Sequence, residues 1–151
     1  MKKLSLLFLV LALVGQAFAQ TNKTIVNLDK RGMAVQGYDP VAFFTDQKPV
    51  KGKADLQSTY HGAIYLFATA EHKALFDASP EKYEPAFGGY CAYGVSKGHL
   101  APVKVDAFQI VDGRLLMQNS THVRDSFNED QKGNLAKADA TWPELVDKSG
   151  K

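Results

Sequence analysis

One segment of the chain concentrates residue types that could bind a metal or act as a nucleophile. Residues 87–99 read FGGYCAYGVSKGH, so the only cysteine, Cys91, lies among glycines and tyrosines, and His99 follows eight residues later. A thiolate suits copper(I) and zinc, and an imidazole suits copper, zinc and iron. The segment therefore indicates a metal or redox site built around Cys91.

A metal site needs three or four converging ligands, so other segments must contribute. The chain has four histidines. We select His61, in an apolar and aromatic run, as the leading nitrogen ligand and His99 as the next, with an oxygen of Tyr38 or Asp39 as an alternative. The predicted metal set is Cys91, His61 and His99, holding copper or zinc, and no organic cofactor is expected.

Two other interpretations of these residues stay open. A binding module without metal would hold a small molecule or a partner protein in a pocket lined by Tyr38, Asp39, Tyr60, Tyr90 and Tyr93. A thiol-dependent enzyme would use Cys91 with a histidine base and Asp39 or Asp106 to orient that base. Phosphate-binding loops, zinc-protease helices and hydrolase elbows are absent from the sequence, so binding is favoured over catalysis. Without any ligand, Cys91 is a small buried hydrophobe.

The N-terminus has the layout of a secretory signal peptide. Lys2 and Lys3 precede an apolar run over residues 4–14, and Ala17 and Ala19 supply the small residues that signal peptidase reads. The run is shorter than the roughly 18 to 20 residues that a membrane-spanning helix needs. We expect cleavage after Ala19, a periplasmic or secreted protein, and no membrane attachment after cleavage.

Size and charge limit the classes of function. Cleavage leaves about 130 residues, enough for one domain with its own core. It also removes Lys2 and Lys3, so 16 of the 18 basic residues remain against 16 acidic ones. Neither a basic stripe nor a run of like charges is present, which argues against nucleic acid and anionic membranes as partners. A single cysteine cannot form a disulfide within the chain, so a disulfide-linked homodimer is one candidate state.

The pattern of apolar residues and turn signals predicts an α+β fold, a small single domain with a short antiparallel sheet of hairpins packed by several helices. Residues 20–35 form a flexible leader and residues 36–147 the domain. We find no internal repeat. The first expected elements are a strand over residues 60–67 and a helix over 70–78 capped by Thr69. A hairpin is expected over 108–117, with its turn at Asp112-Gly113. A helix then begins at Ser120 or Thr121, and a second helical segment begins after Gly133 and ends near Trp142-Pro143.

Several of these motifs together resemble the YHS domain. The run YHGAIYLF at residues 60–67, followed by Phe76 and by PEKY at 80–83, is similar to that module, and GYDPVAFF at 37–44 resembles its Asp-Pro-Val-Cys opening. With residues 88–92, 111–113 and 138–143, the chain resembles a family of exported YHS-domain proteins over nearly its whole mature length. The resemblance implies a YHS-type core of a hairpin and a helix. We expect a periplasmic protein that binds, handles or senses a soft metal ion, most plausibly copper.

The sequence departs from the family where metal-binding forms of the module carry cysteines. Those forms have one cysteine after Asp-Pro-Val and two in a Phe-Cys-Ser-x-x-Cys motif, and the corresponding positions here are Ala42, Ala68 and His72. An alanine has no donor atom, so the family's metal site does not transfer to Ala42 or Ala68. His72 alone would bind weakly, and we expect it to be solvated or half-buried. Any metal site is therefore expected around Cys91.

Overall fold

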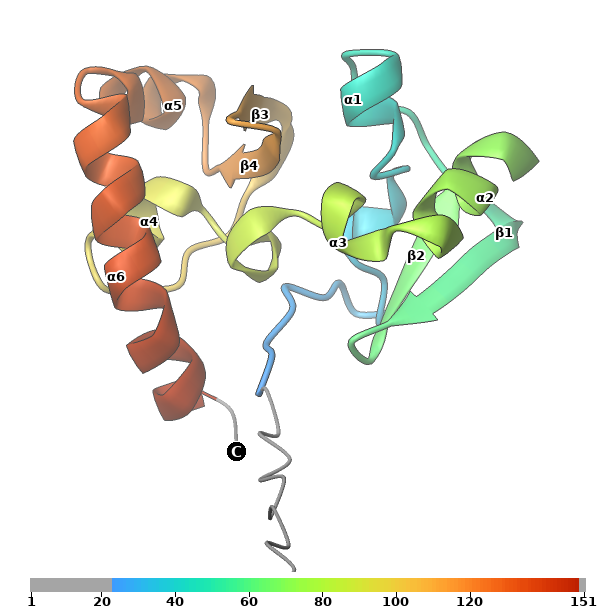
Figure 1. Ribbon diagram of the computed structural model, residues 1–151, viewed down its shortest axis with the longest axis horizontal. Coiled ribbons are helices and arrows are strands. Elements are labelled where there is room, and N and C mark those ends of the chain that lie inside the picture. Colours follow the sequence, from blue (N-terminus) through green and yellow to red (C-terminus); the bar gives the residue numbers. More distant parts are fainter. Residues whose placement is uncertain (1–22, 150–151) are drawn as a thin grey trace, which may run out of the picture.

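The computed structural model describes residues 23–149, and the expected signal peptide with its cleavage site lies outside them. Within this range, no helix is both long and apolar enough to cross a membrane. The described residues form helices and two antiparallel hairpins, which confirms the predicted α+β class (Figure 1).

The chain is built as two consecutive units with the same order of elements. Corresponding elements begin 50 or 51 residues apart, for example at Lys53 and Lys104. The first unit contains η1 (Val35–Gly37), α1 (Ala42–Thr45), β1 (Lys53–Tyr60), β2 (Ala63–Phe67), α2 (Ala70–Ala78) and α3 (Pro80–Tyr83). The second contains η2 (Ala86–Gly89), α4 (Ala92–Ser96), β3 (Lys104–Val111), β4 (Arg114–Gln118), α5 (Thr121–Asn128) and α6 (Gln131–Ser149).

The two hairpins agree in register and in turn geometry. Each shows an irregularity after its first pair, Lys53↔Phe67 in one and Lys104↔Gln118 in the other. Each turns through two residues of positive φ, His61-Gly62 at 48° and 75° and Asp112-Gly113 at 50° and 73°, as a type I′ turn requires. The expectation of no internal repeat is therefore wrong. The two units repeat the same backbone structure, although most of their side chains differ.

The helix after each hairpin begins and packs in the same way. The Thr69 hydroxyl accepts a hydrogen bond from the backbone N–H of His72, and the Ser120 hydroxyl accepts one from that of Val123. These caps satisfy N–H groups that have no partner inside the helix. The prediction of a helix over 70–78 with Thr69 as its cap is confirmed, and so is a helix opening at Ser120.

Two expected elements are wrong in extent. Residues 60–67 are not one strand, because His61-Gly62 is a turn that separates β1 from β2. Gly133 and Pro143 do not interrupt the last helix, since α6 runs from Gln131 to Ser149. A glycine or proline weakens a helix locally, and packing of the buried α6 face overrides that preference here.

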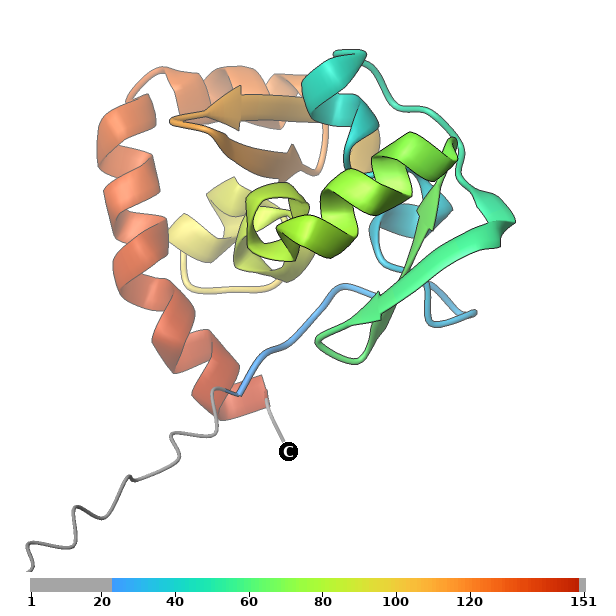
Figure 2. The same ribbon diagram turned by 45° about the vertical axis from the view of Figure 1, so that its right-hand side comes forward.

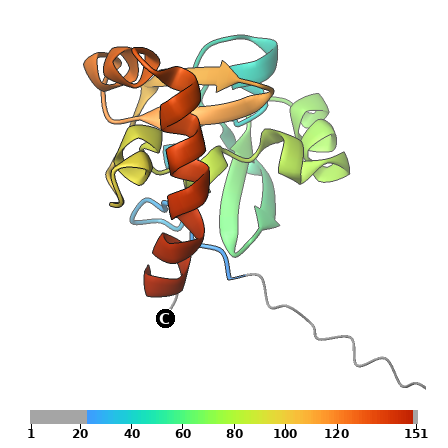
Figure 3. The same ribbon diagram turned by 60° about the vertical axis from the view of Figure 1, so that its left-hand side comes forward.

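Two buried clusters fill the fold, and the first spans both units, because it also contains Cys91, Val103, Leu115 and Met117 of the second unit. Phe76 is the buried residue of α2 and packs on Tyr60, Tyr65 and Phe67 in the first cluster. Its counterpart in α5, Phe127, is fully buried in the second cluster, where α6 packs along α4 (Figure 3). The N-terminal segment runs between the units, and the N–H of Asn27 donates to the Gly88 carbonyl at 2.8 Å (Figure 2).

Candidate functional site

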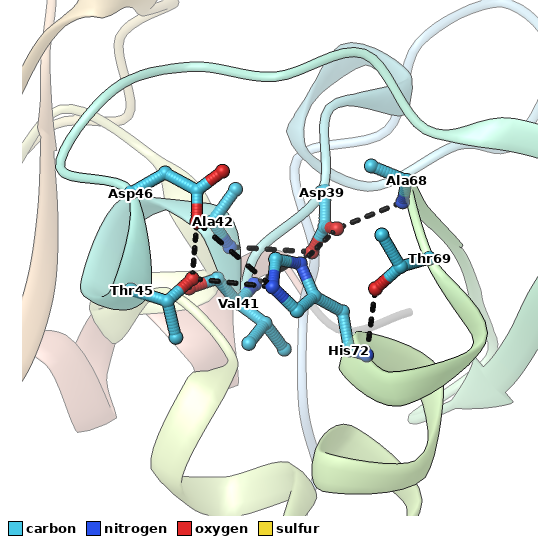
Figure 4. Close-up of polar contacts among 8 residues, drawn as sticks. All are labelled: Asp39, Val41, Ala42, Thr45, Asp46, Ala68, Thr69 and His72. Carbon is cyan, nitrogen blue, oxygen red and sulfur yellow. Dashed lines mark hydrogen bonds and ion pairs between the residues drawn. The ribbon is translucent and has the colours of Figure 1, made fainter.

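A fully buried carboxylate lies at the centre of the first unit. Asp39 follows η1, and its Oδ1 accepts hydrogen bonds from the N–H groups of Val41 (2.9 Å) and Ala42 (3.3 Å) at the start of α1. Its Oδ2 accepts from the N–H of Ala68 (2.8 Å), after β2, and from Nδ1 of His72 (2.7 Å), on α2 (Figure 4). One carboxylate thus joins three elements and is fully hydrogen-bonded, as a buried charge must be.

Asp39 fixes the orientation of the His72 ring. Because Nδ1 donates to a carboxylate, the free lone pair of the neutral imidazole is on Nε2. That atom lies 3.3 Å from Thr45 Oγ1 and 3.9 Å from Asp46 Oδ1, both at the end of α1. The His72 side chain is 12% exposed, so Nε2 is near the surface but only slightly hydrated.

Three possible ligand atoms lie close together at this point, namely Nε2 of His72, Oγ1 of Thr45 and Oδ1 of Asp46. Thr45 Oγ1 and Asp46 Oδ1 are 2.7 Å apart, so the separations among the three atoms are 2.7, 3.3 and 3.9 Å. Metal–ligand bonds of about 2.0 to 2.2 Å place neighbouring ligands about 3 to 3.5 Å apart. One imidazole and two oxygens suit copper(II) or zinc(II).

The second unit places Cys91 where the first has Asp39. In both, three residues of positive φ precede a tyrosine, namely Val35–Gly37 before Tyr38 and 87–89 before Tyr90. The next backbone N–H then donates to a facing loop, from Asp39 to Val50 O at 2.8 Å and from Cys91 to Ala101 O at 3.1 Å. The two side chains therefore occupy equivalent positions.

The Cys91 thiol is buried and hydrogen-bonded. Cys91 is 2% exposed, and its Sγ donates a hydrogen bond to Gln118 Oε1 at 3.3 Å. The same oxygen accepts a second hydrogen bond from the N–H of Tyr93 at 3.1 Å. Cys91 directly precedes α4. Burial means that an intermolecular disulfide would require Cys91 to be uncovered first.

A surface hollow of about 380 Å³ opens beside Cys91. Val123 stands there at the position of His72, because both are the third residue after their capping residues. A valine lacks the imidazole, so space that the ring fills in the first unit is open in the second. The hollow is lined by Cys91, Tyr93, Gly94, Lys97, His99, Ala101, Asn119 and Val123. Two of the predicted ligands, Cys91 and His99, thus share one hollow.

His61 does not join them. It is the first residue of the β1–β2 turn, its ring stacks on Tyr60, and its Nδ1 lies 3.1 Å from Glu84 Oε2 along a different cavity. Over residues 23–149, no group of three or more His, Cys, Asp or Glu side chains is placed to hold a metal ion. Cys91, His61 and His99 therefore do not form one site, because His61 belongs to a turn rather than to a strand beside Cys91.

The residues expected to line a ligand pocket are also dispersed. Asp39 binds His72, Tyr93 lines the Cys91 hollow, and Tyr90 packs on the second cluster. The Lys51 ammonium lies 4.7 Å from the centre of the Tyr38 ring, and the Tyr60 ring packs on that of His61. These five side chains serve separate parts of the fold.

The sequence does not by itself indicate that His72 pairs with Asp39. The available signals were that Asp39 sits in an Asp-Pro turn, where aspartate often caps backbone N–H groups, and that His72 is in the first turn of a capped helix. Nothing in their 33-residue separation shows that the two meet.

Comparison with protein families identifies the first unit. Residues 41–86 match the YHS domain, a span that includes Thr45, Asp46 and His72 and begins two residues after Asp39. No curated protein and no solved structure showed a significant match to the chain.

Proposed function

We propose that this protein is an exported metal-binding protein that handles or senses a divalent ion, copper(II) or zinc(II), at His72 of its YHS domain. YHS domains are associated with metal binding, and with copper in particular, which fits a metal-related role. The observation that carries the proposal is the hydrogen bond between the buried Asp39 carboxylate and Nδ1 of His72.

A carboxylate on the second nitrogen is the usual partner of a metal-binding histidine. It fixes the tautomer and raises the basicity of the nitrogen that faces the metal. Asp39 is itself held by three backbone N–H groups, so the ring needs little reorganisation on binding. His72 Nε2, Asp46 Oδ1 and Thr45 Oγ1 would be the protein ligands, and water would take the remaining positions. Handling or sensing of a metal ion fits such an open, three-ligand site better than catalytic turnover of a substrate.

The hollow at Cys91 is a second candidate site, for a soft ion such as copper(I). Two observations favour it: Cys91 and His99 line the same hollow, and that hollow is the counterpart of the His72 site in the repeat. A thiolate ligand there would have to lose its proton and its hydrogen bond to Gln118. A module that binds no metal remains the alternative function.

Metal titration of the purified, chelator-stripped protein tests both sites. We expect zinc(II) or copper(II) to bind with a 1:1 stoichiometry and to raise the melting temperature of the wild type, because binding to the folded state stabilises it. His72→Ala should abolish the effect, and Asp46→Asn should weaken binding, because it removes the carboxylate ligand. His61→Ala is the matched control, since it removes another carboxylate-bonded histidine and should leave binding unchanged.

Two results would contradict the His72 site: absence of stoichiometric binding by the wild type, or unchanged affinity in His72→Ala. If copper(I) binds under reducing conditions and only Cys91→Ala removes it, the second site is the functional one.

Cleavage of the N-terminal signal peptide tests whether the protein is exported. Expression with the native N-terminus in a bacterium should yield a periplasmic protein that begins at Gln20, because Ala17 and Ala19 direct cleavage after Ala19. N-terminal sequencing and mass spectrometry of the fractionated protein measure this. A cytoplasmic product that retains residues 1–19 would refute the proposal.

A further inference from the structure

A separate cavity of about 230 Å³ lies where the two hairpin turns meet the linker between the units. The β1–β2 turn contributes His61, and the β3–β4 turn contributes Gly113 and Arg114 from the equivalent position of the repeat. Glu81 and Lys82 of α3 line it, as do residues 84–88 after that helix, residues 24–26 of the N-terminal segment and Trp142 of α6. Junctions between structural units are common places for ligand pockets.

The acidic side of this cavity is incompletely neutralised. Glu84 has a side chain that is 26% exposed and pairs only with His61 among the described residues. Burial raises the pKa of Glu84, the nearby histidine lowers it, and the charge of Glu81 raises it further. No ion pair of Glu81 is found within residues 23–149. A bound cation would relieve the repulsion between the two carboxylates.

The basic side chains at the cavity are largely engaged elsewhere. Arg114 forms two hydrogen bonds with Asp139, at 2.9 and 3.1 Å, and its guanidinium lies 5.1 Å from the centre of the Phe87 ring. The Lys82 ammonium lies 5.0 Å from the centre of the Tyr83 ring. Arg114 is therefore already paired with a carboxylate, and Lys82 is the remaining lysine ammonium at the rim.

Part of the cavity wall is aromatic. The Phe87 and Trp142 rings pack edge to face, with centroids 5.9 Å apart at 71°. Trp142 is half-buried and lines the cavity. Aromatic faces attract both apolar groups and cations. The volume lies below the roughly 300 to 1,000 Å³ of pockets for drug-sized ligands, so the occupant must be small.

We propose that this cavity binds a small organic cation, with the carboxylate of Glu84 taking an ammonium group and the Trp142 ring taking the apolar body. The site is distinct from the metal site, because neither Asp39 nor His72 lines it. It makes the protein a binder of amines as well as of a metal ion.

The fluorescence of Trp142 reports directly on this cavity, because it is the only tryptophan of the chain. We would titrate the purified protein, in the presence of a chelator, with benzylamine, its neutral analogue benzyl alcohol and the anion benzoate. Benzylamine should change the Trp142 emission saturably and bind at least tenfold more tightly than benzyl alcohol, and benzoate should not bind. Calorimetry should give one amine site per chain.

Substitutions of single residues show which side chains contribute to amine binding. Glu84→Gln should weaken benzylamine binding tenfold or more, and Glu81→Gln, at an exposed position, should weaken it less without risk to the fold. Glu144→Gln removes a 72% exposed glutamate on the same helix as Trp142 and should leave binding unchanged. His72→Ala should retain full amine binding, which separates this site from the metal site.

Three outcomes would overturn the proposal: no saturable response to benzylamine up to about 10 mM, which corresponds to a binding free energy weaker than about −3 kcal/mol; equal or tighter binding of benzoate; or unchanged amine affinity in both Glu84→Gln and Glu81→Gln.

Discussion

Asp39→Ala should lower the free energy of unfolding by about 3 to 5 kcal/mol, the range for removing one partner from a buried charged network. The substitution leaves the N–H groups of Val41, Ala42 and Ala68 without their acceptor, and it leaves Nδ1 of His72 unpaired. Each unsatisfied buried donor costs about 1 to 3 kcal/mol. Alanine also removes the group that joins the start of α1 to β2 and α2.

Urea unfolding followed by circular dichroism measures this loss. The repeat supplies the matched control, because Cys91 is the counterpart of Asp39. Cys91→Ala removes a single hydrogen bond, to Gln118 Oε1, and that oxygen keeps the Tyr93 N–H. We expect Cys91→Ala to cost about 1 kcal/mol. A loss below about 1 kcal/mol in Asp39→Ala, or equal losses in the two variants, would show that the carboxylate does not hold the first unit together.

Truncation of the central phenylalanine of either unit should cost about 3 to 5 kcal/mol. Phe76 and Phe127 are 1% and 0% exposed, and they occupy equivalent positions on α2 and α5. Phe76→Ala removes contacts with three aromatic rings, and Phe127→Ala removes an edge-to-face contact with Tyr93. A domain of this size is stable by about 5 to 15 kcal/mol, so each single variant is close to the limit of folding.

The double variant tests whether the two buried clusters are separate packing units. Phe76 and Phe127 belong to different buried clusters, so their losses should add within about 0.5 kcal/mol. Leu75→Ala, at a residue that is 38% exposed on α2, is the control and should cost much less. Denaturant unfolding of the four proteins gives the coupling energy. A coupling above about 1 kcal/mol would mean that the two clusters act as one core.

The repeat gives the two candidate metal sites a common structural basis. The same turn, short helix, hairpin and capped helix surround Asp39 in the first unit and Cys91 in the second. In the first, the imidazole of His72 fills the space and presents a nitrogen near the surface. In the second, Val123 leaves a hollow beside a thiol. One framework thus places a nitrogen ligand, His72, in the first unit and a thiol, Cys91, in the second, at different positions of the repeat.

Local sequence determined the elements whose signals lie within a few residues of one another. Thr69 caps α2 because its hydroxyl reaches an N–H three residues away, and Asp112-Gly113 closes the second hairpin because both residues accept positive φ. The class of fold and the YHS character of the first unit could be read from such patterns. The same reasoning failed for His61-Gly62, because a histidine at positive φ is a weak signal beside the aromatic residues around it.

Tertiary structure alone decided which distant groups meet. The sequence pointed to Cys91 as the centre of function, yet Cys91 reaches His99 across one hollow while His61 pairs with Glu84 elsewhere. Asp39 and His72 were each visible as a residue type, but the folding of α2 back over the start of α1 is what makes them a pair. Side-chain chemistry is encoded residue by residue, whereas a site depends on contacts between segments far apart in the chain.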